Sequence, residues 1–548
     1  MDAQPTIKPL PKHLPMAIAG LFWIIYFVRF GYDFGASDQD EMLPYLYRLL
    51  DPTLYSTDWF VRNMTDHLNV RTYFIYALYL PALVLPVWLV AALGYTACWI
   101  VIVQSVYQIS LRILRDALGA VLATFFVIVF FHKVTLGAND LVYHLLVPEL
   151  VAWAFVLPAL VMYWNKKMQT AALLLGLGTC FHLITGLTTG LVLVLLVLWQ
   201  VRESALSWQS GIQFIAIYGL AALPIVGPIA FQQLTTRPTT TLAALLETGT
   251  PYEILVHFRL PLHHLSNYAP SRTLGWLFLM ILGIGAFYYL RKSGVLRHQT
   301  FLIRFTLISS VLIGLSFLGV ETFHSLILAK FQFYKLAVWL KLFALALVAG
   351  AIGNILKTHL PQIHEAIAHT VFQLPRITAA LFFVGISLLA MGIWSKNERL
   401  FEKAGPIFYQ ASELAKMEQW ISQNTQKNTL FAIPPSNTTF RSHAKRSIVV
   451  NWLSFPFRDS EMVFWRHQLQ QVAPLATIPV PFRNAPTVLD LAYHDHHNTA
   501  HPPEWRWTSL LPRKPDYILR HLKSEKKPYT LPIAHKNREW VLYKWPKW

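Results

Sequence analysis

The chain has 548 residues, of which 55% are hydrophobic and only 14% are charged. Soluble domains carry about a quarter charged residues, so this composition excludes an ordinary soluble protein. The formal net charge of +18 does not indicate a nucleic-acid-binding protein, because no run of Lys and Arg lies within a soluble nucleic-acid-binding fold.

Apolar stretches of about 20 residues, enough to cross a hydrocarbon core, recur along residues 1–394. They predict a polytopic α-helical membrane protein with about eleven transmembrane helices. No cleavage site follows the first stretch, so we interpret it as a retained helix. The stretch 71–87 is broken by Pro81 and Pro86 and is interpreted as a re-entrant or interfacial segment. The expected spans lie near 16–34, 88–110, 117–133, 147–164, 169–184, 187–201, 208–230, 273–290, 300–319, 325–355 and 377–394.

Positive charge in the short loops predicts the orientation, because cytoplasmic loops carry an excess of Lys and Arg. A single topology places all of these residues inside: Lys8, Lys12, Arg112, Arg115, Lys166, Lys167, Arg202, Arg291, Lys292, Arg297, Lys357 and Arg376. The N-terminus is then cytoplasmic, and the first outward loop spans about 35–87. We predict a membrane domain at 1–394 and an outer domain at 395–548. The outer domain carries 22 Lys and Arg against 12 Asp and Glu, a charge that suits anionic membrane lipids.

Four acidic residues follow the first helix within nine positions, namely Asp33, Asp38, Asp40 and Glu41. Carboxylates at a lipid boundary are costly unless they lie in water or bind a cation or an acceptor. One of them can act as a general base on an acceptor hydroxyl, or bind a divalent ion that holds a phosphate. The alternative is a solvated loop in which Asp38 or Asp40 caps the following helix.

The second outward loop and a later helix end supply further polar residues to the same side of the membrane. Asn139, Asp140 and His144 lie in the loop, Glu149 lies one turn deeper, and His182 lies at the outer end of its span. A single histidine within a membrane domain is usually structural. Because several polar positions occur on one side, we predict that these residues line a substrate pocket together with Glu41.

Cationic residues occur in a later outward segment and in the tenth span. Arg259, His263 and His264 lie in PYEILVHFRLPLHH, and such groups suit phosphate oxygens. Charge within an apolar span normally marks a functional path, and Lys335 is the expected phosphate counter-charge with Gln332 beside it in the pocket. Lys330 and Lys341 lie in the same span, where Lys330 is close enough to the helix end to reach water.

The segment 395–548 predicts a small α/β domain, with a helix at 406–424 and strands at 429–435, 446–453, 516–522 and 538–545. Its aromatic residues could stack on sugars, but a role in the core is favoured; they are Trp452, Phe455, Phe457, Trp465, Trp505 and Trp507. His494, His496, His497 and His501 have the look of a metal cluster but lie in a polar, Pro-rich loop, so no metal site is predicted from them.

This pattern resembles the GT-C superfamily of membrane glycosyltransferases, which includes protein O-mannosyltransferases and lipid A aminoarabinose transferases. The similarity is one of architecture over nearly the whole chain, and Asp38 or Asp40 matches the first-loop acidic position of the family. The DQD-E run and the segments LLDPTLYSTDWFV, FRLPLHH and FAIPPSNTTFR also resemble bacterial proteins of this kind without an assigned substrate.

The resemblance implies a multi-pass enzyme of the bacterial inner membrane with a periplasmic C-terminal domain. It implies a polyprenyl-phosphate sugar as donor, inversion at the sugar carbon, and a glycan, lipid or protein as acceptor. Lys335 and Arg259 replace the outer arginine that is frequent in the family. A divalent cation, Mg or Mn, remains open; Asp38, Asp40 and Asp140 are the residues that would bind it.

Three alternatives remain. A lipid-linked glycan polymerase or ligase would use a large outer loop rich in Arg and His, which 251–264 partly offers, but such proteins seldom end in an outer α/β domain. A transporter predicts inverted repeats and broken helices near the midplane, and no repeat is present in the sequence. A non-catalytic assembly protein would tolerate loss of its first-loop acids.

Overall fold

The computed structural model describes residues 14–35, 37–235, 248–373, 412–475, 484–498, 514–525 and 528–545. The chain forms two compact units, each assembled from separated segments. Unit 1 comprises Met1–Tyr32, Ala91–Val226 and Leu262–Pro406, and unit 2 comprises Asp33–Val90, Gly227–Pro261 and Ile407–Trp548. Unit 2 therefore combines the predicted C-terminal domain with two segments that the sequence assigned to the membrane domain.

The described part of the chain is mostly helical, and its apolar helices fit a membrane-embedded protein. Six are long and apolar enough to cross a membrane: Val87–Leu114, Leu183–Arg202, Trp208–Thr235, Pro270–Lys292, Gln299–Thr322 and Leu326–His359. Four further predicted spans are shorter apolar helices: Pro15–Phe27, Ala117–Phe130, Pro148–Trp164 and Met168–Phe181. The structure thus does not support the predicted count of about eleven, and the last predicted span, 377–394, lies outside the described residues.

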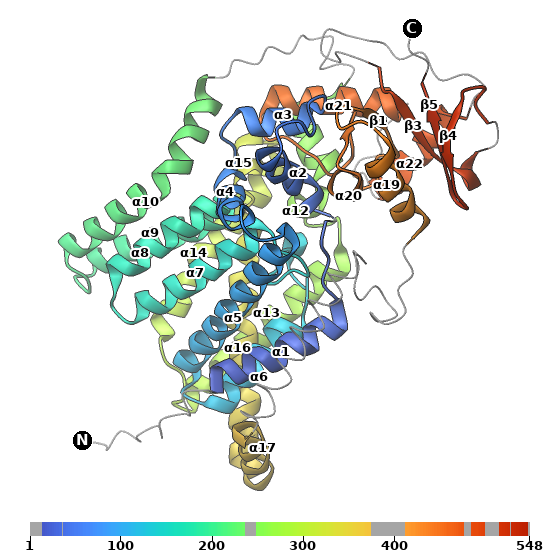
Figure 1. Cartoon of the computed structure of the whole chain (residues 1–548). Coiled ribbons are helices and arrows are strands. Elements are labelled where there is room, and N and C mark those ends of the chain that lie inside the picture. The colour runs from blue at the N-terminus through green and yellow to red at the C-terminus, as the bar shows by residue number, and fades with distance from the viewer. Residues whose placement is uncertain are drawn as a thin grey trace. The chain divides into compact units, whose positions relative to one another are not determined.

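Unit 1 is a bundle of helices. Its helices are α1 (Leu14–Phe30), α6 (Ala117–Phe125), α7 (Pro148–Trp164), α8 (Met168–Phe181), α9 (Leu183–Arg202), α13 (Pro270–Lys292), α14 (Gln299–Ser316), α15 (Leu326–Phe331), α16 (Ala337–His359) and α17 (Pro361–Gln373). Short π- or 3-10 turns occur at η1 (Phe126–Phe130), η2 (Leu136–Ala138), η4 (Phe317–Thr322) and η5 (Phe333–Leu336). The helix α7 packs against α8, and α16 packs against α13 and α6 (Figure 1).

Three elements contribute to both units, namely α5 (Val87–Leu114), α10 (Trp208–Thr235) and α12 (Pro261–His264). The helix α4 (Thr72–Ala82) has 11 residues and is followed by a turn at 83–85, directly before Pro86. Because a span needs about 20 residues, α4 is too short to cross a bilayer on its own, in keeping with the interpretation of 71–87 as a re-entrant or interfacial segment.

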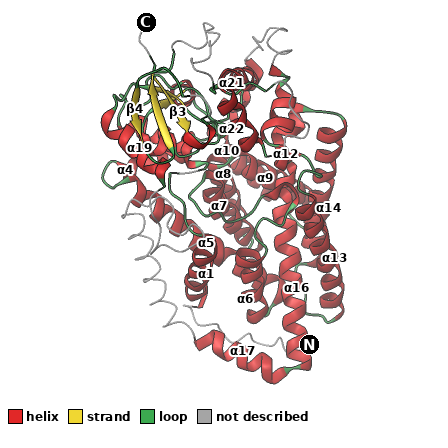
Figure 2. Ribbon diagram, turned by 90° about the vertical axis from the view of Figure 1, so that its right-hand side faces the viewer, coloured by secondary structure: helices red, strands yellow, loops and turns green. Residues whose placement is uncertain are grey.

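Unit 2 contains a five-stranded sheet of order β2-β1-β3-β5-β4. Its strands are β1 (Leu430–Ala432), β2 (Ser447–Ile448), β3 (Tyr517–His521), β4 (Ile533–Lys536) and β5 (Trp540–Lys544), seen in yellow in Figure 2. The strand β1 pairs in parallel with β2 and β3, with Leu430 opposite Ser447, whereas β5 is antiparallel to β3 and β4. The four predicted strands are confirmed, and β4 was missed because IAHK has a weak strand pattern.

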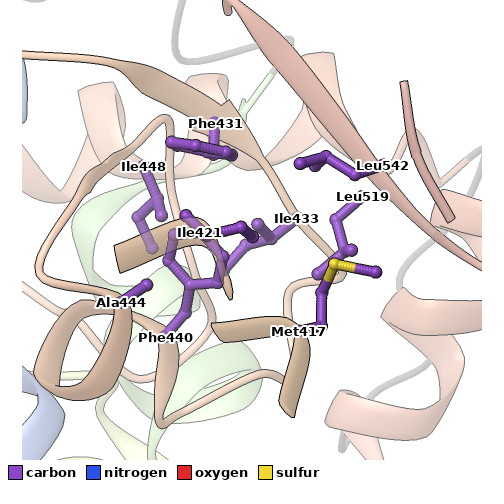
Figure 3. Packing of buried hydrophobic residues seen from close by; sticks show 9 residues of the cluster. All are labelled: Met417, Ile421, Phe431, Ile433, Phe440, Ala444, Ile448, Leu519 and Leu542. Atoms are coloured by element: carbon purple, nitrogen blue, oxygen red, sulfur yellow. The ribbon is translucent and has the colours of Figure 1, made fainter. Parts of the chain in front are cut away.

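Besides α4, the helices of unit 2 come from its three separated segments: α2 (Gln39–Leu50), α3 (Trp59–Asp66), α19 (Glu413–Asn424), α20 (Phe440–Ala444), α21 (Asp459–Val472), α22 (Ala485–His496), and the turns η3 (Glu253–Arg259) and η7 (Leu522–Ser524). The helix α2 packs against α3, α4 and α20. A hydrophobic core joins the sheet to α19 and α20 through Met417, Ile421, Phe431, Ile433, Phe440, Ala444, Ile448, Leu519 and Leu542 (Figure 3). The segment predicted as the first outward loop is thus part of the folded α/β unit.

Candidate functional site

The predicted site residues fall into both units. Unit 2 holds Asp38, Asp40, Glu41 and Arg259. Unit 1 holds the other predicted residues, namely Asn139, Asp140, His144, His182, His263, His264, Gln332 and Lys335. The predicted site residues therefore form two groups, one in each unit, which are described separately.

Asp40 is a fully buried carboxylate in the first turn of α2. It accepts hydrogen bonds from the backbone N–H of Ser442 at 2.9 Å and from Nδ2 of Asn451 at 3.1 Å. Burial raises the pKa of Asp40 to about 6, against the opposing field of Arg441. Because both carboxylate oxygens already accept hydrogen bonds from the polypeptide, Asp40 holds the first outward loop to the α20–β2 region and is poorly placed to take a proton from a substrate.

The turn before α2 is also shaped by this packing. Gly35 has a φ of +76°, and a Cβ at this position would lie 2.5 Å from Nε2 of His443. Its backbone N–H donates to Oε1 of Gln39 at 2.8 Å. The positive φ favours glycine here, and a Cβ would also displace the ring of His443.

Asp38 occupies the N-cap of α2 and, unlike Asp40, is exposed. Its side chain makes no capping hydrogen bond, so the predicted capping role is not realised through the carboxylate. The negative charge of Asp38 raises the pKa of Glu41 and the pKa of Arg259. Of the two aspartates that the sequence could not separate, Asp38 is the one exposed to solvent.

Glu41 is buried beside Asp40 and forms an ion pair with Arg71. Its Oε1 accepts the backbone N–H of Phe455 at 3.3 Å. Burial raises the pKa of Glu41, while the charges of Arg71 and Arg259 lower it. Glu41 therefore fixes Arg71 and the loop that carries Phe455, and its role as a pocket residue stays a prediction.

Arg259 ends the π-helical turn η3 and is partly buried against aromatic rings. Its guanidinium lies 5.4 Å from the ring centroid of Trp452 and 5.8 Å from that of Phe455, and one Nη donates to the carbonyl of Leu453 at 3.0 Å. Burial lowers its pKa, whereas Glu41 and Asp38 raise it. Its Nε has no hydrogen-bond partner among the described residues, so the guanidinium keeps donor capacity for an anion.

The aromatic residues beside Arg259 are largely core residues. Trp452, Phe455 and Trp465 are buried and pack edge to face or tilted on one another. Trp505 and Trp507, together with His501, lie outside the described residues. A core role therefore fits Trp452, Phe455 and Trp465, whereas Phe457 is only half-buried. Trp452 and Phe455 form the aromatic wall beside the guanidinium of Arg259.

A buried ion pair that the sequence analysis missed joins the first outward loop to α20. Both oxygens of Asp58 accept hydrogen bonds from Arg441, at 2.7 Å from Nε and 3.1 Å from Nη2, and both side chains are fully buried. Asp58 also accepts the backbone N–H groups of Val61 and Ile448 at 3.1 and 3.0 Å. An aspartate directly before the helical residues WFV is typical of a helix N-cap, so the sequence could have predicted the capping role of Asp58. No local pattern could have predicted its distant partner, Arg441.

In unit 1, Lys335 lies in a buried ion pair. Its Nζ donates to Oε1 of Glu149 at 2.8 Å and to Oδ1 of Asn139 at 3.3 Å. Glu149 also accepts hydrogen bonds from Thr185 at 3.2 Å and Tyr143 at 2.8 Å. Glu149 thus already neutralises Lys335, which limits the capacity of this lysine as a free counter-charge for phosphate.

A second buried pair lies close to it in unit 1. Nζ of Lys341 is 2.8 Å from Oδ1 of Asp140 and donates to the carbonyl of Phe131 at 3.1 Å. His132 lies 3.2 Å from the other oxygen of Asp140. Buried charges are tolerated when they are paired and hydrogen-bonded in this way, so Lys341 and Asp140 fix the loop after η1 against α16.

The remaining predicted residues of unit 1 hold helix ends and turns. Nδ1 of His263 lies 2.9 Å from the carbonyl of Gly137, and Nδ1 of His182 caps α9 by accepting the N–H of Thr185 at 3.2 Å. Gln332 has a φ of +49° and separates α15 from η5, so the predicted tenth span is interrupted there. His264 is buried, and His144 is half-buried in the second outward loop.

The described residues were also compared with the ligand sets of metal sites. Within the described ranges, no group of three or more His, Cys, Asp and Glu side chains is arranged to hold a metal ion. His497 is fully buried, with Nδ1 2.7 Å from the hydroxyl of Tyr529, and burial lowers the pKa of His494 to about 4. The described histidines of this group lie in or directly after α22, with His497 at its C-cap, so the prediction of a loop at 494–497 was wrong.

One family model matches part of the chain. Residues 412–472 match a domain described as "Domain of unknown function (DUF6798)". These residues contain α19, β1, α20, β2 and α21, and thus Arg441, Ser442 and Asn451, which bind the acids of the first outward loop. No curated protein matches the chain.

Proposed function

We propose that this protein is a GT-C-type glycosyltransferase that moves a sugar from a polyprenyl-phosphate donor to an acceptor at the periplasmic face of the bacterial inner membrane. The N-terminus is cytoplasmic and the α/β part of unit 2 is periplasmic. Glycans, lipids and proteins are the acceptor classes. The proposal is carried by two features of unit 2: the exposed Asp38 at the N-cap of α2, and Arg259, whose Nε has no hydrogen-bond partner among the described residues.

In the proposed reaction, the carboxylate of Asp38 accepts the proton of the acceptor hydroxyl. The acceptor oxygen attacks the anomeric carbon and forms the new glycosidic bond, while the bond from that carbon to the phosphate oxygen breaks. The bond electrons leave with the polyprenyl phosphate, and the configuration at the sugar carbon inverts. Arg259 stabilises the negative charge that develops on the leaving phosphate.

Three features of the described residues support this division of roles. Asp40 and Glu41 are held by hydrogen bonds and an ion pair, so they position α2 rather than react. Lys335 is neutralised by Glu149, which favours Arg259 over Lys335 as the phosphate ligand. The aromatic wall of Trp452 and Phe455 restricts water around Arg259, and a charge interaction is stronger where water is excluded.

The test is direct transfer by the purified full chain in detergent. A panel of labelled polyprenyl-phosphate sugars is supplied with a membrane extract as the source of acceptor, and labelled product is measured. We expect product from at least one donor of the panel, together with release of polyprenyl phosphate. Transfer from lipid-diphosphate donors alone would instead identify a polymerase or ligase, and no transfer from any donor would refute the proposal.

A further inference from the structure

Arg466 is a fully buried arginine on α21 in unit 2. None of its three side-chain nitrogens has a hydrogen-bond partner among the residues that the structure describes. Its guanidinium instead lies over the ring of Phe258, with 4.0 Å from the central carbon to the ring centroid. Phe258 immediately precedes Arg259 in η3, and α21 packs against η3.

The other fully buried arginines of unit 2 provide a comparison. Arg441 is paired with Asp58 and also donates to Asn451 at 3.3 Å and to Ser454. Arg520 is 3.1 Å from Oε1 of Glu525. Both guanidiniums are thus neutralised by a carboxylate of the same unit. Arg466 is the exception, although its burial is equally complete.

A buried charge without a counter-ion is costly, and a single cation–π contact returns only part of that cost. Burial lowers the pKa of Arg466 to about 10, so the side chain remains positively charged at neutral pH. The surroundings are aromatic, since Phe258 lies 4.9 Å from Trp452 and 6.0 Å from Trp465 between ring centroids. Among the described residues, no negatively charged group with oxygen acceptors completes this site.

We propose that Arg466 anchors an oxyanion-binding site that takes a phosphate group, separate from the phosphate role assigned to Arg259. The planar fork of guanidinium donors matches two phosphate oxygens at once, and the apolar surroundings strengthen the charge interaction. The phosphate can be free in solution or belong to a lipid headgroup, and both present the same oxygens. Because the guanidinium is closed to solvent, the side chains that cover it must move for the anion to enter. This site does not depend on sugar transfer.

The test measures thermal unfolding of the full chain in a phosphate-free, uncharged detergent at constant ionic strength. Sodium chloride is exchanged for inorganic phosphate, for acetate, or for a short-chain polyprenyl phosphate in separate titrations. A ligand that binds only the folded state raises the melting temperature with concentration. We expect a saturable rise with inorganic phosphate or with the lipid phosphate, and no comparable rise with acetate. A rise with the lipid alone would identify the headgroup as the source.

Substitutions of Arg466 test whether its guanidinium causes the phosphate-dependent rise in melting temperature. Arg466→Met is expected to lose the phosphate-dependent rise, and Arg466→Lys, which keeps the charge but not the fork, is expected to bind at least about 10-fold more weakly. Arg62→Met, at an exposed arginine on α3, is the matched control and should keep the full rise. If Arg466→Met does not fold, Arg466→Lys alone decides. An absent response of the natural chain, an equal response of the Arg466 variants, or an equal response to acetate would overturn the proposal.

Discussion

Replacing Asp38 by asparagine is expected to reduce sugar transfer by at least about 100-fold while leaving the fold intact. General-base catalysis contributes factors of about 10²–10⁴, and an amide cannot accept the proton of the acceptor hydroxyl. Asp38 is exposed and its side chain makes no capping hydrogen bond, so the substitution should cost little stability. The measurement is the initial rate of labelled product formation by the purified variant, with kcat and KM determined separately.

Two further variants make this result specific. Asp66→Asn changes another exposed aspartate of unit 2 and should retain full activity. Asp40→Asn places an amide donor against Nδ2 of Asn451, whose own Oδ1 is held by the N–H of Ser454 at 2.9 Å. It should therefore lower the stability of unit 2 first and activity only as a consequence. Normal transfer by folded Asp38→Asn protein would remove Asp38 from the mechanism.

The second large effect concerns the stability of unit 2. Replacing Asp58 by asparagine is expected to destabilise this unit by about 3–5 kcal/mol, because it leaves Arg441 buried without its counter-charge. The measurement is hydrogen–deuterium exchange of peptides from 33–90 and 412–472 in the full chain, since both partners of the ion pair lie in these segments. Exchange should accelerate in both segments together.

An exposed ion pair in the same unit provides the matched control. Asp51 lies 2.6 Å from Lys427, and both side chains are partly open to solvent. Asp51→Asn should cost at most about 1 kcal/mol, the usual range for a surface pair. The double variant Asp58→Leu with Arg441→Met should recover part of the stability that Asp58→Asn loses, because it removes the unpaired charge. Equal exchange in Asp51→Asn and Asp58→Asn proteins would contradict this account.

The elements of the fold were largely predictable because they depend on local patterns. Apolar stretches located the helices of unit 1, and alternating residues located four of the five strands. The predicted count is not supported because four of the predicted spans form shorter apolar helices among the described residues, namely Pro15–Phe27, Ala117–Phe130, Pro148–Trp164 and Met168–Phe181. Several predicted spans are therefore shorter or interrupted.

The partners of the polar residues were not predictable in the same way. Asp58 and Arg441 are separated by 383 positions, and Asp40 and Asn451 by 411, so no local spacing connects them. The sequence identified the acidic cluster after the first helix but could not distinguish the exposed Asp38 from the buried Asp40, because both follow the same pattern. It also did not indicate that Glu149 would neutralise Lys335. Tertiary packing determines each of these outcomes.

The most direct test of the central claim is a structure of the full chain bound to a polyprenyl-phosphate sugar analogue that cannot transfer its sugar. The account predicts the analogue's phosphate on the guanidinium of Arg259 and its anomeric carbon facing Asp38, with room for an acceptor hydroxyl between that carbon and the carboxylate. Binding of the analogue with Asp38 turned to bulk water and Arg259 free of phosphate would contradict it.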